Sequence, residues 1–297
     1  MDKKGLELPL LFMLPALIWG STFFVIKFQL GVVPPIWSVS YRFLAGGLIL
    51  LTFSKARRLK LEFGLKDHLT IALQGVLLFG FNYWLVYISE KELVSALVAI
   101  AFSTLIFFNI IFGSVLLKRK TNQRVYLGAL FGLVGTVLLF YQELRSISYE
   151  SWPVISTILC ALSVVIASLG NITSAYNSGK GLPVIQVNGY GMIYGGLTMA
   201  VIALLTGESP AFDLSFNYVG SLLYLTILGS VIAFETYLTL ISNIGPDRAA
   251  YVLVMIPVFA LVLSIVFEGY QWSWIVMLGI ASILFGNVLV LRKKKLT

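Results

Sequence analysis

Long apolar stretches separated by short polar connections run through the whole chain. An α-helix rises 1.5 Å per residue, so about 20 apolar residues are needed to cross the ~30 Å hydrocarbon core of a bilayer. Ten stretches approach this length, at residues 9–28, 34–53, 68–88, 94–117, 124–141, 152–175, 184–206, 217–240, 248–267 and 273–291. The pattern therefore predicts an all-α membrane protein with ten transmembrane helices.

The two halves of the chain resemble each other. At shifts of 151 or 149 positions the clearest matches are Leu127 with Leu278, Gly135 with Gly286, and Tyr41 with Tyr190. We therefore predict two five-helix repeats, residues 1–145 and 146–297. Because five is an odd number, the second repeat enters the membrane from the opposite side to the first. Such inverted repeats are typical of secondary transporters.

Basic residues gather in the loops on one side of the predicted membrane. Seventeen of the 21 Lys and Arg residues fall in the loops on the amino-terminal side, and the opposite loops hold only Lys91 and Arg145. The remaining two, Lys27 and Arg42, fall within predicted helices. Because cations are retained on the cytoplasmic side, the distribution predicts that both termini are cytoplasmic.

The composition agrees with the membrane assignment and argues against a water-soluble protein and a nucleic-acid-binding protein. Hydrophobic residues make up 59% of the chain and charged residues 11%, which is too little polar surface for a water-soluble globule. The net charge of +8 is spread over short loops, so no nucleic-acid partner is expected. The apolar run that follows Lys3 and Lys4 lacks a cleavage pattern and is predicted to remain as a spanning helix. Cys160 is the single cysteine, so no intramolecular disulfide forms.

Small residues four positions apart occur in several predicted helices. Such pairs let helix backbones approach closely inside a membrane, although glycine is also common in membrane helices without such a role. The pairs are Gly128 with Gly132, Gly191 with Gly195, and Ser282 with Gly286.

Three groups of residues carry a resemblance to a known family. They are Trp19–Phe23 in the first predicted helix, Tyr41–Gly47 in the second, and Pro257–Phe259 followed by Glu268 in the ninth. In this order and spacing, and with the five-plus-five duplication, the chain resembles the EamA family of the drug/metabolite transporter superfamily. The first half departs from the pattern, because Phe107 stands where the second half has Pro257, and Leu117-Lys118 stand where a glutamate is usual.

The resemblance implies a multi-pass permease of the bacterial inner (plasma) membrane. It also implies a cavity between the halves, and in many members the export of amino acids or other small metabolites. These implications define a class of solutes rather than one substrate. Whether such a chain works as a monomer or a homodimer is left open.

Motifs for enzymatic chemistry are missing from the sequence. There is no phosphate-binding loop for ATP, no HExxH pair or His/Cys cluster for a metal, and no GxSxG nucleophile. We therefore expect no enzyme activity, no cofactor and no metal, and we expect a gradient to drive transport. A membrane-embedded enzyme that uses buried Asp, Glu or Tyr, and a structural scaffold, are the alternatives from other classes.

Ionisable residues inside predicted helices are functional candidates, because charge is costly in a bilayer. Arg42 is a candidate for binding a substrate carboxylate, or else it pairs with helix-end carbonyls. Glu235 is the one acid deep in an apolar run and is predicted to bind a proton or a substrate ammonium, or else to reach cytoplasmic water. Lys27, at a helix end, is predicted to extend to the membrane surface.

Neutral polar and aromatic residues complete the predicted substrate lining. Such side chains can stack on a planar solute or surround a cation, although many only pack or mark the membrane interface. The interfacial belt is assigned to Tyr87 and Trp272. The predicted lining, besides Arg42 and Glu235, is Trp19, Ser21, Asn82, Tyr83, Trp84, Thr104, Asn171, Tyr190, Tyr194 and Tyr251.

Together these features predict a secondary transporter of the inner membrane, working by alternating access on a small solute, with protons as a candidate coupling ion. Export of amino acids or similar small polar metabolites is the preferred function. Efflux of lipophilic cations or drugs is the alternative within transport, since Glu235 and the aromatic residues would suffice for it and Arg42 would oppose it.

Overall fold

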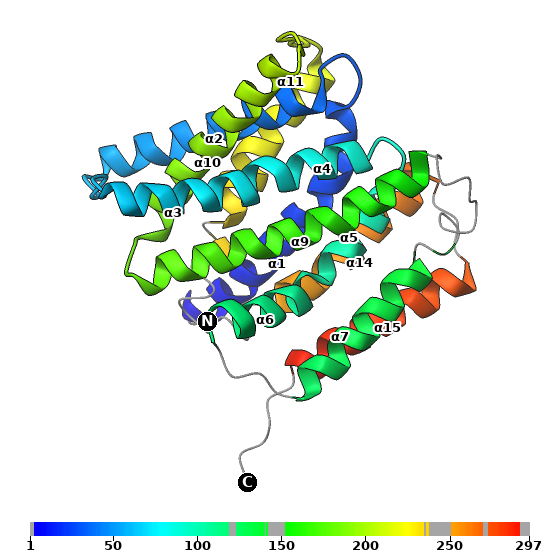
Figure 1. Cartoon of the computed structure of the whole chain (residues 1–297). Coiled ribbons are helices and arrows are strands. Elements are labelled where there is room, and N and C mark those ends of the chain that lie inside the picture. Colours follow the sequence, from blue (N-terminus) through cyan, green and yellow to red (C-terminus); the bar gives the residue numbers. More distant parts are fainter. Residues whose placement is uncertain are drawn as a thin grey trace. The chain divides into compact units, whose positions relative to one another are not determined.

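The computed structural model describes residues 3–118, 123–139, 141, 152–234, 236–237, 251–269 and 273–291. Within these ranges the regular structure is helical and includes no strand. Figure 1 shows the succession of helices along the chain. The all-α prediction is confirmed for the described residues.

Six helical segments are long and apolar enough to cross a membrane. They are Leu10–Gln29, Pro35–Ala56, Leu65–Ser89, Ser95–Leu116, Trp152–Gly179 and Val184–Leu205. Shorter apolar helices fall on the other four predicted ranges, at Tyr126–Gly135, Phe216–Ile232, Met255–Phe267 and Trp274–Gly286. The chain is that of a multi-pass membrane protein.

The chain divides into two compact units. The first unit contains Met1–Phe24, Glu92–Ile158 and Ala233–Thr297, and the second contains Val25–Lys91 and Leu159–Ile232. Neither unit coincides with one predicted repeat, because each takes segments from both halves of the sequence.

The second unit is built from eight described elements and the greater part of α9. The helix α9 (Trp152–Gly179) enters it at Leu159. The other elements are η1 (Lys27–Gln29), α2 (Pro35–Ala56), α3 (Leu65–Gly75), η2 (Val76–Phe81), α4 (Asn82–Ser89), α10 (Val184–Leu205), α11 (Phe216–Tyr224) and η3 (Leu225–Ile232).

Helices α2 and α10 run antiparallel and pack closely. The Ser40 hydroxyl donates to the Gly196 carbonyl at 2.9 Å, and a Cβ placed on Gly47 would lie 2.8 Å from the Gly189 carbonyl oxygen. Only residues without a side chain permit this approach. On another face of α10, a Cβ on Gly195 would lie 2.6 Å from the Gly75 carbonyl oxygen of α3. The predicted role of the Gly191/Gly195 pair in helix contact is confirmed.

Two π-helical segments, η2 and η3, interrupt the α-helices of the second unit. They begin at Val76 and Leu225, which are 149 positions apart, the same shift that relates the two halves of the sequence. The Ser230 hydroxyl of η3 donates to the Leu225 carbonyl, five residues earlier, at 3.0 Å. A π-helical segment changes the direction of the side chains that follow it and is frequent at functional sites.

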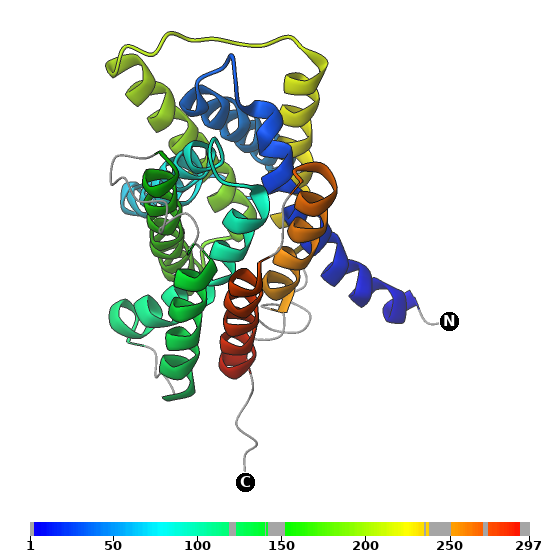
Figure 2. The same ribbon diagram turned by 90° about the vertical axis from the view of Figure 1, so that its right-hand side faces the viewer.

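The connection from α10 to α11 is long and is held by α2. Figure 2 shows it passing from the end of α10 to the start of α11. Trp37 donates its indole N–H to the Glu208 carbonyl at 3.1 Å, and the Tyr41 hydroxyl donates to the Ala211 carbonyl at 3.1 Å. These two bonds fix the connection against the first turns of α2.

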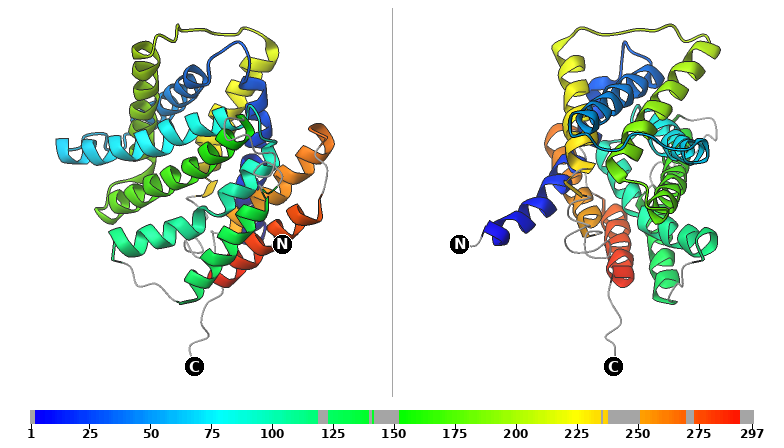
Figure 3. Two further views of the ribbon diagram at one scale, coloured as in Figure 1. Left: turned by 45° about the vertical axis from the view of Figure 1, so that its right-hand side comes forward. Right: turned by 90° about the vertical axis from the view of Figure 1, so that its left-hand side faces the viewer.

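The described elements of the first unit include a closely packed antiparallel helix pair, α7 and α15. The helices of the first unit are α1 (Lys3–Ile26), α5 (Ser95–Ser103), α6 (Leu105–Leu116), α7 (Gln123–Leu139), α14 (Tyr251–Phe267) and α15 (Trp274–Leu291). The last two residues of α1, after Phe24, belong to the second unit. Figures 1 and 3 show α7 and α15 side by side.

Glycines make the contact between α7 and α15. A Cβ on Gly286 would lie 2.6 Å from the Gly128 carbonyl oxygen, and one on Gly135 would lie equally close to that of Gly279. The Ser282 hydroxyl donates to the Phe131 carbonyl at 2.8 Å. These contacts confirm the predicted small-residue pairs in both helices.

The fourth predicted helix is broken. It consists of α5 and α6, with Thr104 between them at φ −77° and ψ −10°. The side chains of Ser103 and Thr104 donate to the carbonyls of Ile100 and Ala101. Such bonds to the preceding turn compete with the helical pattern and favour a bend.

Candidate substrate-binding site

Arg42 is the centre of the candidate site, in the second unit. Its side chain is fully buried. Its Nε–H donates to the Ser230 hydroxyl oxygen at 3.1 Å. The guanidinium carbon lies 4.6 Å from the ring centroid of Tyr83 and 5.1 Å from that of Phe43. A cation over aromatic faces in a desolvated place is favourable by about 2 kcal/mol.

The two terminal nitrogens of Arg42 are not used by these contacts. Neither Nη1 nor Nη2 has a hydrogen-bond partner among the described residues. No carboxylate in the described ranges forms an ion pair with Arg42; the ion pair found there is between Lys180 and Asp67. Both nitrogens are buried N–H donors, which makes them candidates for binding an anionic group.

Close packing by η3 brings Ser230 to Arg42. A Cβ added to Gly46, one helical turn after Arg42, would lie 3.7 Å from the Ser230 Cβ and 3.9 Å from the Thr226 side chain. Both distances are ordinary van der Waals contacts, so η3 packs directly against α2 at this turn. The π-helical geometry of η3 then sets the direction of the Ser230 hydroxyl.

Tyr87 and Glu90 lie near Arg42. Both side chains are fully buried. The Tyr87 hydroxyl lies within hydrogen-bonding reach of the Arg42 side chain and within electrostatic range of Glu90. In the described part of the chain that hydroxyl makes no hydrogen bond of normal geometry. The assignment of Tyr87 to the interfacial belt is therefore wrong: the tertiary packing of α4 turns it inward.

Lys27, which the sequence predicts to extend to the membrane surface, donates its ammonium to the backbone carbonyl of Glu90 at 2.5 Å, in the turn that follows α4. Beside it, the buried Gln29 amide donates to the Tyr218 carbonyl at 2.8 Å and also to the Ser221 hydroxyl. These bonds tie η1 to α4 and α11.

Two other predicted lining residues of the second unit lie on α4. Asn82 is buried, and its amide donates to the Leu78 carbonyl at 3.1 Å, while its Oδ1 has no partner among the described residues. Trp84 is partly exposed and its ring lies 6.2 Å from that of Phe81. Asn171, on α9, is partly buried.

Tyr190 and Tyr194 form a separate aromatic cluster. Their rings are stacked, with centroids 6.3 Å apart, as expected for an i, i+4 pair. The Tyr194 hydroxyl shares a hydrogen bond of 2.8 Å with His68 Nδ1, and the Tyr190 hydroxyl donates to the Leu61 carbonyl at 3.0 Å. Their hydroxyls point to the loop before α3 and to its first turn, whereas Arg42 points to η3 and α4.

The remaining predicted residues belong to the first unit or lie outside the described residues. Trp19 contacts the rings of Phe234 and Tyr237 with centroids 5.1 and 5.3 Å away. Ser21 and Thr104 donate their hydroxyls to carbonyls of their own helices. Tyr251 is the first residue of α14, and its side chain is outside the described set. Glu235 also lies outside it.

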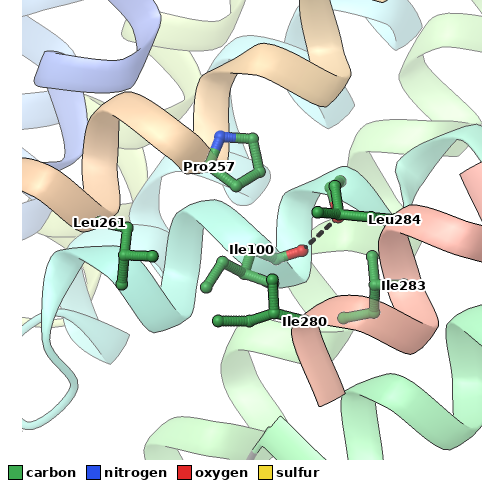
Figure 4. Close-up of a pocket in the computed structure, with 7 residues that line it drawn as sticks. Ile100, Pro257, Leu261, Ile280, Ile283 and Leu284 are labelled. Carbon is green, nitrogen blue, oxygen red and sulfur yellow. Dashed lines mark hydrogen bonds between the residues drawn. The ribbon is translucent and has the colours of Figure 1, made fainter. Parts of the chain in front are cut away.

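A small apolar pocket lies in the first unit beside Pro257 (Figure 4). The Ser103 hydroxyl is satisfied by the Ile100 carbonyl at 2.7 Å, and no lining residue is charged, so the pocket does not suit a polar solute. Groups of three or more His, Cys, Asp or Glu residues that could hold a metal do not occur among the described residues. The pocket is lined by Ile100, Ser103, Pro257, Leu261, Ile280, Ile283 and Leu284.

Sequence reasoning identified Arg42 and Tyr83 but missed Ser230 and Tyr87. Ser230 stands in the apolar run Leu225–Ile232 with Thr226 as the other hydroxyl residue of η3. A hydroxyl side chain inside an apolar run is the sequence feature that could have identified Ser230. Its partner Arg42 is 188 residues away in sequence, so the contact required the tertiary structure.

Comparison with known proteins identifies the family. The model of the EamA-like transporter family matches residues 8–141 and again 154–292. A relative in Escherichia coli K12, named uncharacterized inner membrane transporter YedA, is 32% identical over 282 residues, covering 94% of this chain and 89% of its own. The transporter YoaV of Bacillus subtilis is 24% identical, covering 82% and 83%.

A solved crystal structure has the same fold. It superposes with a TM-score of 0.68 and covers 94% of both chains at 19% sequence identity. The family model and the relatives agree with the apolar helices of the structure. The chain therefore belongs to the EamA-like transporter family of the drug/metabolite transporter superfamily, and it is a multi-pass membrane transporter.

Proposed function

We propose that the protein is a secondary transporter that exports amino acids or similar small polar metabolites across the bacterial inner membrane by alternating access. The family and its named relatives support transport. The observation that carries the choice of solute is the buried Arg42, whose terminal nitrogens have no partner in the described chain. A lipophilic cation would be repelled by this charge, which disfavours drug efflux as the alternative.

The proposal includes ten membrane spans arranged as two inverted repeats, with both termini in the cytoplasm. Two observations support it. The family model matches two separate ranges of the chain. In addition, two pairs of helices related by the sequence repeat, α2 with α10 and α7 with α15, each pack antiparallel, as corresponding helices of inverted repeats can.

The residues proposed to bind the solute are supported by different kinds of evidence. Arg42 rests on the geometry described above, and Asn82 and Trp84 follow on the adjacent helix α4. Trp19, Ser21, Thr104, Tyr190, Tyr194 and Tyr251 remain proposals from sequence, as does Glu235 as the proton-coupling residue. A membrane-embedded enzyme is the weaker alternative, since the family consists of transporters.

Counterflow into proteoliposomes tests the function. Vesicles containing the purified protein are loaded with one unlabelled amino acid, and uptake of the same radiolabelled amino acid is followed for each member of a panel. We expect uptake above protein-free vesicles for at least one amino acid, and no uptake of quaternary amines. Uptake of quaternary amines alone would overturn the choice of solute.

A further inference from the structure

The segment that joins α2 to α3 carries a cluster of positive charge. Residues 55–66, here called the basic connection, contain five basic residues and one acidic residue, Glu62, and all six side chains are exposed. None of the five cations forms an ion pair within the described chain, where the ion pair found joins Lys180 to Asp67. The five basic residues are Lys55, Arg57, Arg58, Lys60 and Lys66.

The basic connection lies at the membrane surface. It joins two apolar spans, Pro35–Ala56 and Leu65–Ser89, and Figure 1 shows the chain passing directly from α2 to α3. Only residues 57–64 lie between the two spans, and the headgroup region extends about 5–8 Å beyond the hydrocarbon on each side. The cations are therefore held at the depth of the lipid headgroups, on whichever side these spans emerge.

Hydrogen bonds fix the backbone of the basic connection. The N–H groups of Arg58 and Leu59 donate to carbonyls in the last turn of α2 at 3.0 and 2.9 Å, and Arg58 adopts the left-handed conformation with φ 56°. Farther along, the Leu61 carbonyl accepts from the Tyr190 hydroxyl of α10 at 3.0 Å. The Phe63 ring packs edge-on against Tyr190, with centroids 5.9 Å apart. The charged side chains are thus presented from a backbone tied to α2 and α10.

Polar and apolar residues alternate along the connection. Residues 58–63 read Arg-Leu-Lys-Leu-Glu-Phe, and alternate residues of an extended chain point to opposite sides. Leu61 and Phe63 are partly buried, whereas Lys60 and Glu62 are exposed. The apolar side chains therefore pack towards the unit while the charged side chains face outward.

Exposed apolar side chains accompany the cations. Phe53 is exposed, and the Arg57 guanidinium carbon lies 5.5 Å from its ring centroid. Leu65 and Leu69, in the first turns of α3, are also exposed. A phospholipid presents an anionic headgroup beside apolar acyl chains and matches both kinds of side chain, whereas a soluble anion matches only the charges.

We propose that the basic connection, together with Phe53, Leu65 and Leu69, is a binding surface for anionic phospholipids that stabilises the folded protein. Cations in loops also direct orientation during membrane insertion. That role depends on how many cations lie on one side, and it requires neither a fixed backbone nor exposed apolar neighbours. The inference rests on the membrane location of the protein and is independent of the transported solute.

Thermal shift of the full-length protein in a neutral detergent tests the proposal. The probes are phosphatidylglycerol, which carries one negative charge, and phosphatidylcholine with the same acyl chains, which carries no net charge. We expect phosphatidylglycerol, but neither phosphatidylcholine nor inorganic phosphate, to raise the melting temperature, because a ligand that binds only the folded state stabilises it. The difference between the two lipids should disappear in 1 M NaCl, where the Debye length is about 3 Å.

Two variants of equal net charge locate the effect. The first removes three cations of the basic connection, and the second removes three cations near the carboxy terminus. Each cation close to an anionic lipid surface is worth about 5-fold in affinity, so the first variant should bind phosphatidylglycerol on the order of 100-fold more weakly. The second variant should respond as the wild type does. The substitutions are Lys55→Gln, Arg57→Gln and Lys60→Gln in the first variant, and Lys293→Gln, Lys294→Gln and Lys295→Gln in the second.

A variant that preserves charge controls for folding. With Lys55→Arg, Arg57→Lys and Lys60→Arg combined, the protein should respond to phosphatidylglycerol as the wild type does. Equal shifts with the two lipids, or with phosphatidylglycerol and inorganic phosphate, would overturn the proposal. It would also fail if the variant lacking three cations of the basic connection kept the wild-type response. An equal loss in both neutralised variants would make the effect a property of net charge and would contradict the assigned surface.

Discussion

The carboxylate of Glu268, one residue beyond α14, caps the start of α5 through Ser95. Its two oxygens lie 3.3 and 3.2 Å from the Ser95 backbone nitrogen, and the Ser95 hydroxyl donates to it at 2.9 Å. Ser264 also donates to Glu268, and it accepts from the Ala96 backbone N–H at 2.9 Å. The first N–H groups of a helix have no partner within the helix and attract negative charge, so this contact stabilises the pair α5 and α14.

Glu268→Ala should destabilise the protein by about 1–2 kcal/mol, the usual cost of losing a helix cap. The melting temperature of the purified protein in detergent provides the measurement. Glu92→Gln is the control, since Glu92 is an exposed acid in the loop before α5. Equal melting temperatures for Glu268→Ala and the wild type would mean that water replaces the cap at no cost.

Gly286→Ala should disrupt the packing of α7 and α15, because the new Cβ would lie 2.6 Å from the Gly128 carbonyl oxygen. Overpacking of this kind costs about 1–3 kcal/mol, and it should lower the melting temperature. Gly220→Ala is the matched control, since a Cβ there meets nothing within 4 Å, and the gain in helix propensity should keep that variant as stable as the wild type. The same loss in both variants would contradict the assigned contact.

The pair formed by Lys180 and Asp67, 2.8 Å apart, predicts a pH dependence. The hydrogen bond to Asp67 raises the pKa of Lys180 above its ordinary value. A raised folded-state pKa contributes stability that is present at neutral pH and is lost as the pH rises through that pKa. The melting temperatures of wild type and Lys180→Met should therefore differ slightly at neutral pH and converge under alkaline conditions. A difference that grows with pH would have the wrong sign for this pair.

The proposed topology is open to cysteine labelling. Cys160 is the single cysteine and is buried, so Cys160→Ala provides a background without thiols. In that background Ser148→Cys, in the segment 142–151 that the sequence predicts to be an outer connection, should react with a membrane-impermeant maleimide added to intact cells. Thr297→Cys should react only after permeabilisation. Labelling of Thr297→Cys in intact cells would reverse the predicted orientation.

Glu235, which lies outside the described residues, remains a prediction for proton coupling. The sequence places this carboxyl group in an apolar run, and such a group can take up and release a proton during a transport cycle. Glu235→Gln should insert normally but lose flux driven by a pH gradient, while counterflow persists. The measurement is uptake into proteoliposomes with and without an imposed gradient, with Glu62→Gln as an exposed control. Gradient-driven flux equal to that of the wild type would return Glu235 to a structural role.

The local sequence accounts for the apolar helices of the described chain and for several of their contacts. Apolar length predicts where membrane helices occur, since long, mainly apolar runs such as 184–206 can be stable in a bilayer only as helices. Small residues four apart, as at Gly191 and Gly195, identified faces that pack, because the absence of a side chain is itself the physical cause of the close approach. Arg42 was identified by the cost of placing a charge in an apolar run.

The tertiary structure decided what surrounds Arg42. Ser230 and Tyr87 lie far from it in sequence, and their directions depend on the π-helical segments η2 and η3. Hydropathy carries no signal for such a segment, since π- and α-helices can hold the same apolar residues. Tyr87 near a helix end had the pattern of an interfacial residue, and only the packing of α4 against its neighbours turned it inward. The local sequence thus shows which chemical groups are present, whereas helix packing decides which of them contact one another.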